Sequence, residues 1–190
     1  DKNLAFKSDG SLILNPFFKI HLDNEIKSIN KDIFNLLNID YLLNLKDLIK
    51  RLNSQINIVY NSKKFSRNLI DSLNLQTQLA YGRLNFVKDF SISESRFNCK
   101  GNVNLIDEYP IFNFECKLKS PDKKKLLKKI NVDYKNKNEK LSLIIQGNLN
   151  ILNNKINFDY LEINDYKAKK EDLKFFKDNF ENIVFNQNFL

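Results

Sequence analysis

The four glycines of this 190-residue chain all stand at the head of the same short pattern. Each is followed by an aliphatic residue at the second position and an apolar one at the fourth, as in Gly101-Asn-Val-Asn-Leu105 and Gly147-Asn-Leu-Asn-Ile151; the others are Gly10 and Gly82. Alternation with period two keeps one face of a β-strand apolar, and glycine permits a bulge or a close approach as a sheet bends. We therefore predict that each glycine opens a strand and that the chain builds a curved sheet by repetition.

Hydrophobic patterning extends this prediction to the whole chain. A hairpin is expected from Leu12–Leu14 and Phe18–Leu22, a helix from Asp40 to about Leu52, and nearly continuous β structure from Leu73. A short lysine-rich helix should follow Pro121, with extended structure resuming at Val132–Tyr134. The predicted class is α+β, a curved, mostly antiparallel sheet of repeated strand pairs with several amphipathic helices on one face or capping an end. The expected parts are a mixed helix and strand part over 1–72, the repeated β-hairpin sheet over 73–165 and a C-terminal amphipathic helix over 166–190.

Two late hairpins are similar to each other. Gly101-Asn-Val-Asn-Leu-Ile106 aligns with Gly147-Asn-Leu-Asn-Ile-Leu152, an offset in the range of structural repeats. With turns at Asp107-Glu108 and Asn153-Asn154, Gly101 is expected opposite Phe114 and Gly147 opposite Tyr160, so that an aromatic ring covers each cross-strand glycine.

The same register places Cys99 directly across from Cys116, on the apolar face. The two form either a disulfide, as in an oxidising compartment, or a pair of packed free thiols. The thiols are slightly favoured, because a directly opposed strand pair is a strained geometry for a disulfide.

The sequence offers no catalytic signature. His21 is the only histidine and is expected to face outward from a strand, so no metal site is predicted. Glycine-rich phosphate loops are absent, since the glycines are widely spaced, and no carboxylate pair stands out. We predict a protein that is not an enzyme and takes no cofactor.

The net charge of +8 raises the question of a nucleic-acid partner. The positive charge is mostly lysine spread along the chain, whereas sequence-specific binders rely on arginine, of which there are four. A nucleic-acid partner is therefore not expected. No stretch reaches the ~20 apolar residues that a membrane-spanning helix needs.

The region from Leu84 to Phe185 resembles the C-terminal part of AsmA-like proteins, a bacterial envelope family. The resemblance rests on Phe90-Ser-Ile-Ser-Glu-Ser-Arg-Phe97, on the two glycine hairpins, and on Tyr166-Lys-Ala-Lys-Lys-Glu-Asp-Leu-Lys-Phe-Phe176 with Phe180-Glu-Asn-Ile183. It implies a periplasmic protein tethered to the inner membrane by an anchor outside this segment. Repeated β units would form an apolar groove that carries phospholipid between membranes, in outer-membrane biogenesis.

Strand pairs could supply the dry surface that acyl chains need. The candidate groove residues are Val103, Leu105, Phe112, Phe114, Leu149, Ile151, Phe158 and Tyr160. The same residues could equally form a core beneath the helices. Two other functions stay open: a structural or protein-interaction β-repeat module of the envelope that binds no lipid, and a basic nucleic-acid binder.

Overall fold

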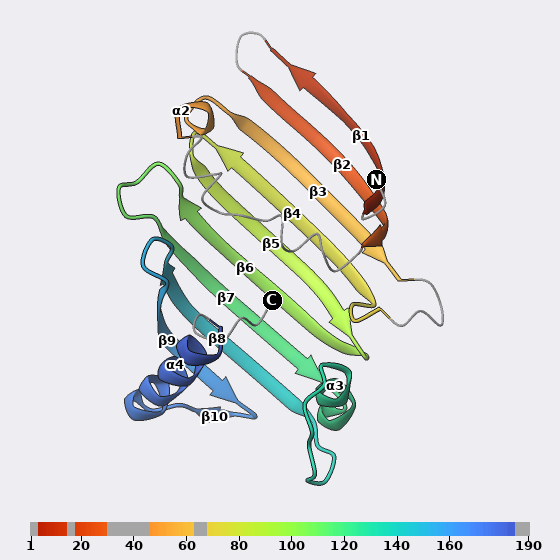
Figure 1. Cartoon of the computed structure of the whole chain (residues 1–190), viewed down its shortest axis with the longest axis vertical. Coiled ribbons are helices and arrows are strands. Elements are labelled where there is room, and N and C mark those ends of the chain that lie inside the picture. The colour runs from red at the N-terminus through yellow and green to blue at the C-terminus, as the bar shows by residue number, and fades with distance from the viewer. Residues whose placement is uncertain (1–3, 15–17, 30–45, 63–67, 185–190) are drawn as a thin grey trace.

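The computed structural model describes residues 4–14, 18–29, 46–62 and 68–184. Most of them belong to one open, curved sheet of ten strands in chain order, from β1 to β10 (Figure 1). The strands are β1 (Leu4–Ile13), β2 (Lys19–Ile29), β3 (Asn53–Asn61), β4 (Ser72–Ala80), β5 (Arg83–Ile92), β6 (Ser95–Asn104), β7 (Ile111–Ser120), β8 (Leu141–Asn150), β9 (Lys155–Ile163) and β10 (Tyr166–Lys167). Every neighbouring pair is antiparallel except β2 and β3, which run parallel.

The expected mostly antiparallel curved sheet is confirmed, but the chain is more uniformly β than expected. The described helices are few, namely α2 (Lys46–Ile49), α3 (Lys123–Lys129) and α4 (Lys170–Val184), so the expected set of several amphipathic helices is not confirmed. Most of the helix expected from Asp40 to Leu52 lies outside the described residues. No strand forms at Val132–Tyr134, where extended structure was expected.

Tight turns join three of the neighbouring strand pairs. The two-residue turns Tyr81-Gly82, Ser93-Glu94 and Asn164-Asp165 have positive φ at both positions, the backbone that two-residue hairpins favour because it matches strand twist. Gly82 supplies one of these positions at φ +88°. Asp71 holds the second turn, since its carboxylate accepts a hydrogen bond of 2.6 Å from the Ser93 amide.

The glycine pattern marks strand interiors more often than strand beginnings. Only Gly82 precedes a strand, whereas Gly10, Gly101 and Gly147 lie inside β1, β6 and β8, which corrects the prediction. Alternation predicts which residues share a face but does not show where along the strand the run begins.

These three glycines lie in one row across the sheet. Successive cross-strand partners lead from Gly10 through β2, β3 and β4 to Phe86 on β5. From there the partners are Gly101, Phe114, Gly147 and Phe158. Phenylalanine and glycine thus alternate over five strands. A Cβ at Gly101 would stand 2.6 Å from the Phe86 ring, and one at Gly147 would stand 3.0 Å from the Phe114 ring. Glycine is needed there because the neighbouring ring covers the backbone.

One face of the sheet is apolar along its whole width. We call it the apolar face; from β2 to β9 it carries, among others, Leu22, Leu75, Phe90, Phe97, Phe112 and Phe158. The opposite, polar face carries a row of amides on successive strands, namely Gln55, Gln78, Asn85, Asn102, Asn113, Asn148 and Asn157. Two of these pairs are hydrogen-bonded, Asn113 to Asn102 at 3.4 Å and Asn157 to Asn148 at 3.3 Å.

The helices pack on the apolar face near its margins. Ile49 of α2 packs with Val103 and Leu105 at one end of the strands. Leu126 of α3 packs with Ile92 and Leu118 at the other end. Helix α4 packs against β9 at the side of the sheet opposite β1 (Figure 1). Two small clusters of the core therefore lie at opposite strand ends.

Candidate functional site: the apolar face between the helices

A strip of aromatic rings crosses the apolar face from β5 to α4. Ring centroids are 5.5 Å apart for Phe86 and Phe112, 6.0 Å for Phe112 and Phe114, and 6.2 Å for Phe114 and Phe158. We call these four residues the aromatic strip. Each is partly buried, so the strip is neither sealed core nor ordinary surface. At ~4.8 Å between strands, β5 to β9 span about 19 Å, comparable with a fatty acyl chain.

Helix α4 closes the strip at its β9 end. The Phe158 ring meets the edges of Phe176 and Phe180, with centroids 4.9 and 5.6 Å away. Edge-to-face contact suits the charge distribution of aromatic rings. The helix also blocks the edge of β9, because the Glu181 carboxylate accepts a 3.0 Å hydrogen bond from the Ile156 amide.

The predicted groove residues divide into three groups. Val103 and Leu105 are each 4% exposed beneath Ile49, and Ile151 packs against the same cluster, so these three are core. Phe112 also contacts that cluster but belongs to the aromatic strip with Phe114 and Phe158. Leu149 of β8 is the cross-strand partner of Phe112. The two interpretations of the apolar residues, core and groove, therefore apply to different parts of one face.

Tyr160, the last of the predicted groove residues, belongs to the other face. The β8–β9 register shifts between Gln146 and Gly147, so that Gly147 pairs with Phe158 and Gln146 with Tyr160. The expected pairing of Gly147 with Tyr160 is therefore wrong. On the polar face Tyr160 lies beside Glu162, whose carboxylate accepts a hydrogen bond from the Tyr160 hydroxyl. Leu161, which is 4% exposed, takes its place on the apolar side.

Cys99 and Cys116 lie opposite each other on the apolar face, as the predicted register requires. Their Cα atoms are 4.1 Å apart and the structure joins them as a disulfide, contrary to the preference for free thiols. The disulfide links β6 to β7 beside the glycine row. The predicted pairing of Gly101 with Phe114 is also confirmed, although the ring closest to Gly101 is Phe86 from the other neighbour.

Lys88 is a residue of this face that the sequence analysis missed. It occupies an inward position of β5 between Phe86 and Phe90, with Leu75 and Cys99 as its cross-strand neighbours. Its ammonium lies 4.6 Å from the centre of the Phe90 ring. Burial lowers the pKa of Lys88 below its ordinary value of 10.5. The signal for it was the alternation Leu84, Phe86, Phe90, Ile92, in which the gap falls at Lys88.

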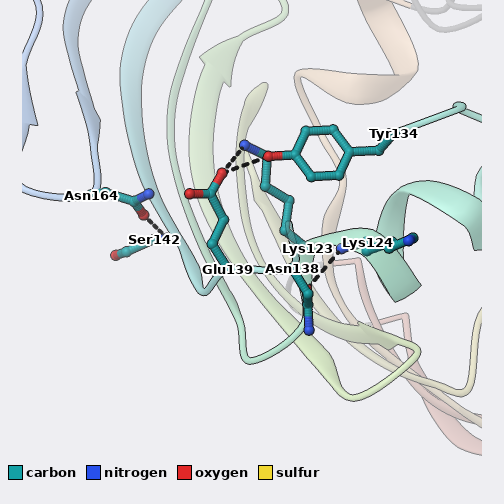
Figure 2. Close-up of polar contacts among 7 residues, drawn as sticks. All are labelled: Lys123, Lys124, Tyr134, Asn138, Glu139, Ser142 and Asn164. Carbon is teal, nitrogen blue, oxygen red and sulfur yellow. Dashed lines mark hydrogen bonds and ion pairs between the residues drawn. The ribbon is translucent and has the colours of Figure 1, made fainter. Parts of the chain in front are cut away.

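Outside the apolar face, a cluster of polar side chains lies around α3 at one end of the strands. Figure 2 shows Lys123 between Tyr134 and Glu139: its Nζ lies 2.6 Å from a Glu139 oxygen and 4.6 Å from the Tyr134 ring centre. The Tyr134 hydroxyl donates to the same carboxylate at 2.7 Å. The hydrogen bond from Lys123 lowers the pKa of Glu139, and that to Glu139 raises the pKa of Lys123. These contacts fix the long β7–β8 connection.

The described surface carries hollows at the strand ends and on the polar face. One of about 590 Å³ opens beside α3 and carries Arg96, Lys119 and Lys140 around Pro121 and Leu141. Another of about 580 Å³ lies over the backbone of Gly101 and Gly147 and is lined mostly by side chains of the polar face. The rings of the aromatic strip remain partly exposed.

The described residues contain no group of three or more side chains arranged to hold a metal ion. His21 faces the polar side of β2, as expected, with Nε2 3.1 Å from an Asp23 oxygen. Within the same part of the chain, no helix is long and apolar enough to cross a membrane. No protein-family model, curated protein or solved structure matches the chain.

Proposed function

We propose that the chain is a non-enzymatic envelope protein of AsmA-like type, whose apolar face holds phospholipid acyl chains in transit between membranes. The observation that carries the proposal is the partly exposed aromatic strip on a sheet whose face stays apolar up to strand β1. Phe6 and Leu12 on β1 are 56% and 57% exposed. Apolar surface of this extent is unfavourable in water and suits an apolar ligand.

The proposed setting is the periplasm, with the full-length protein tethered to the inner membrane and acting in outer-membrane biogenesis. The disulfide between Cys99 and Cys116 suits an oxidising compartment. Surface lysines, including those of α3, would lie near anionic head groups, each contributing roughly 1 kcal/mol close to a charged membrane. The setting otherwise rests on the family resemblance.

Site-specific photo-crosslinking tests the proposal, because neighbouring strand positions face opposite sides. A benzophenone amino acid in place of Phe86 should give phospholipid adducts in cells, whereas the same group in place of Asn85, on the polar face, should give few. Mass spectrometry of lipid extracted from the purified chain should show stoichiometric phospholipid. A folded, lipid-free protein with equal labelling at the two positions would contradict the proposal.

Charged substitutions provide a second check within the predicted groove. Phe112→Glu or Leu149→Glu should reduce lipid adducts at position 86, since either places a carboxylate beside the aromatic strip. Asn113→Glu on the polar face is the matched control. Adducts that persist unchanged in folded Leu149→Glu would count against an acyl-chain surface.

A protein-interaction module is the second candidate, favoured by the outer edge of β1. That edge pairs with no described strand, and every side chain described on β1 is exposed. An unpaired strand edge can accept a strand from another chain. A Leu12→Pro variant that still folds, carries no lipid and no longer binds a protein partner would support this function over lipid binding.

A further inference from the structure

Lys88 is a cationic side chain on the apolar face of the sheet, in the interior strand β5. Its cross-strand row continues through Leu75 on one side and through Cys99, Cys116 and Ile145 on the other. Along its own strand, Phe86 and Phe90 lie two residues away on the same face. The ammonium is therefore set among apolar and sulfur-containing groups, next to the aromatic strip.

Within the described part of the chain, Lys88 forms no hydrogen bond and no ion pair. Its ammonium makes a cation–π interaction with the Phe90 ring. Such a contact stabilises a cation by roughly 0.5–2 kcal/mol but leaves the three N–H donors of the ammonium unbonded. Other lysines of the sheet differ: Lys100 and Lys117, for example, both pair with Glu115 on the polar face.

A partly buried charge without a counter-charge is unfavourable. Burial therefore disfavours the charged form of Lys88 and lowers its pKa. An anion delivered with an apolar ligand would remove this cost. Phospholipids combine both parts, because each carries an anionic phosphodiester next to its acyl chains. The arrangement of one cation beside aromatic rings is complementary to that combination.

We propose that Lys88 binds the phosphate of a phospholipid whose acyl chains lie on the aromatic strip. This inference rests on the proposed function and adds a polar anchor to it, so that the face distinguishes phospholipids from uncharged lipids. The lysine holds the head group by an ion pair with hydrogen bonds, while Phe86 and its neighbours contact the chains.

The test compares two lipids with the same acyl chains, dioleoyl-phosphatidylglycerol and dioleoylglycerol, by the amount retained per chain after detergent-free purification. The unaltered chain should retain phosphatidylglycerol about tenfold better. Lys88→Met should lose this preference while still retaining dioleoylglycerol, and Lys88→Arg should keep most of it. Lys155→Met, which removes a lysine from the polar face, is the matched control and should behave like the unaltered chain.

The outcomes separate this inference from the function on which it rests. If the folded chain retains neither lipid, the proposed function fails. If it retains both equally, or if Lys88→Met keeps the preference, acyl chains bind but the phosphate anchor is wrong. A stronger Lys88-dependent retention of oleate than of phosphatidylglycerol would also overturn the inference, since the anion would then be a carboxylate. Thermal unfolding of each variant confirms that it folds.

Discussion

The two edges of the sheet are built in opposite ways. At the β9 edge, α4 packs Phe176 and Phe180 onto Phe158, and Glu181 accepts the amide hydrogen of Ile156. At the β1 edge no described strand or helix pairs with the backbone, and Phe6 and Leu12 are more than half exposed. One apolar face thus ends against a helix on one side and at an open edge on the other. The difference indicates that the face is closed toward α4 and accessible from β1.

Truncating one leucine at each edge should give the largest difference in stability between the two edges. Leu161→Ala should lower the free energy of unfolding by about 2–5 kcal/mol, because Leu161 is 4% exposed and its removal leaves a cavity. Leu12→Ala should change it by less than about 0.5 kcal/mol, because that side chain is 57% exposed. Chemical denaturation of both variants measures the contrast. Equal losses would show that β1 is covered.

Glycine replacement in the shared row should give a smaller contrast. A Cβ at Gly147 would stand 2.2 Å from the Asn157 carbonyl oxygen, and one at Gly10 would stand 2.2 Å from that of His21. Gly147→Ala should cost about 1–3 kcal/mol, because β8 is held between β7 and β9.

Gly10→Ala should cost less, since β1 has a partner on one side only and can move outward. Denaturation midpoints compare the two variants, and amide exchange locates the response. A larger loss for Gly10→Ala would mean that β1 is as firmly held as the interior strands.

The smallest effect should come from acid at the α4 edge. The Asp172 carboxylate accepts hydrogen bonds from the Lys169 amide at 2.8 Å and the Tyr166 hydroxyl at 3.0 Å. The first of these contributes most to lowering the pKa of Asp172 below its ordinary 3.8. The contribution of the ionised Asp172 carboxylate to folding stability is therefore present above pH 3.8. It is lost as the pH falls through the lower pKa that Asp172 has in the folded state.

Amide exchange in α4 should accordingly rise as that pH is crossed, while exchange in β5 should not. Asp172→Asn should remove this step in α4. A step that persists in Asp172→Asn would assign the acid sensitivity of the edge to another group.

Sequence patterning predicted the strands well where the chain alternates regularly. The hairpin of β6 and β7 followed from alternation and one turn, and this sufficed to place Cys99 opposite Cys116. It failed at β9, because a bulge adds one residue after Phe158 and shifts the apolar positions to Leu161 and Ile163, which moves Tyr160 to the polar face. Patterns specify a face, whereas the register depends on local backbone geometry.

The candidate site was less accessible to sequence reasoning than the fold. Phe112, Phe114 and Phe158 were predicted as lining residues, but the sequence could not separate them from Val103 and Leu105, which lie under Ile49. That division depends on where a four-residue helix lies. Lys88 was missed because a lysine within an alternating strand looks like an interruption, and its position among rings exists only after β5 is paired.

The parallel pairing of β2 with β3 has a consequence for the order of folding. From β4 to β7 each strand follows its partner after a connection of two to six residues, whereas 23 residues separate Ile29 from Asn53. Closing the longer loop costs more conformational entropy, and non-local pairing slows folding. The meander from β4 to β7 should therefore collapse as the first unit, with the β1–β2 hairpin joining afterwards. Until that hairpin joins, β3 is itself a free edge, and the growing sheet is most prone to pair with a second chain there.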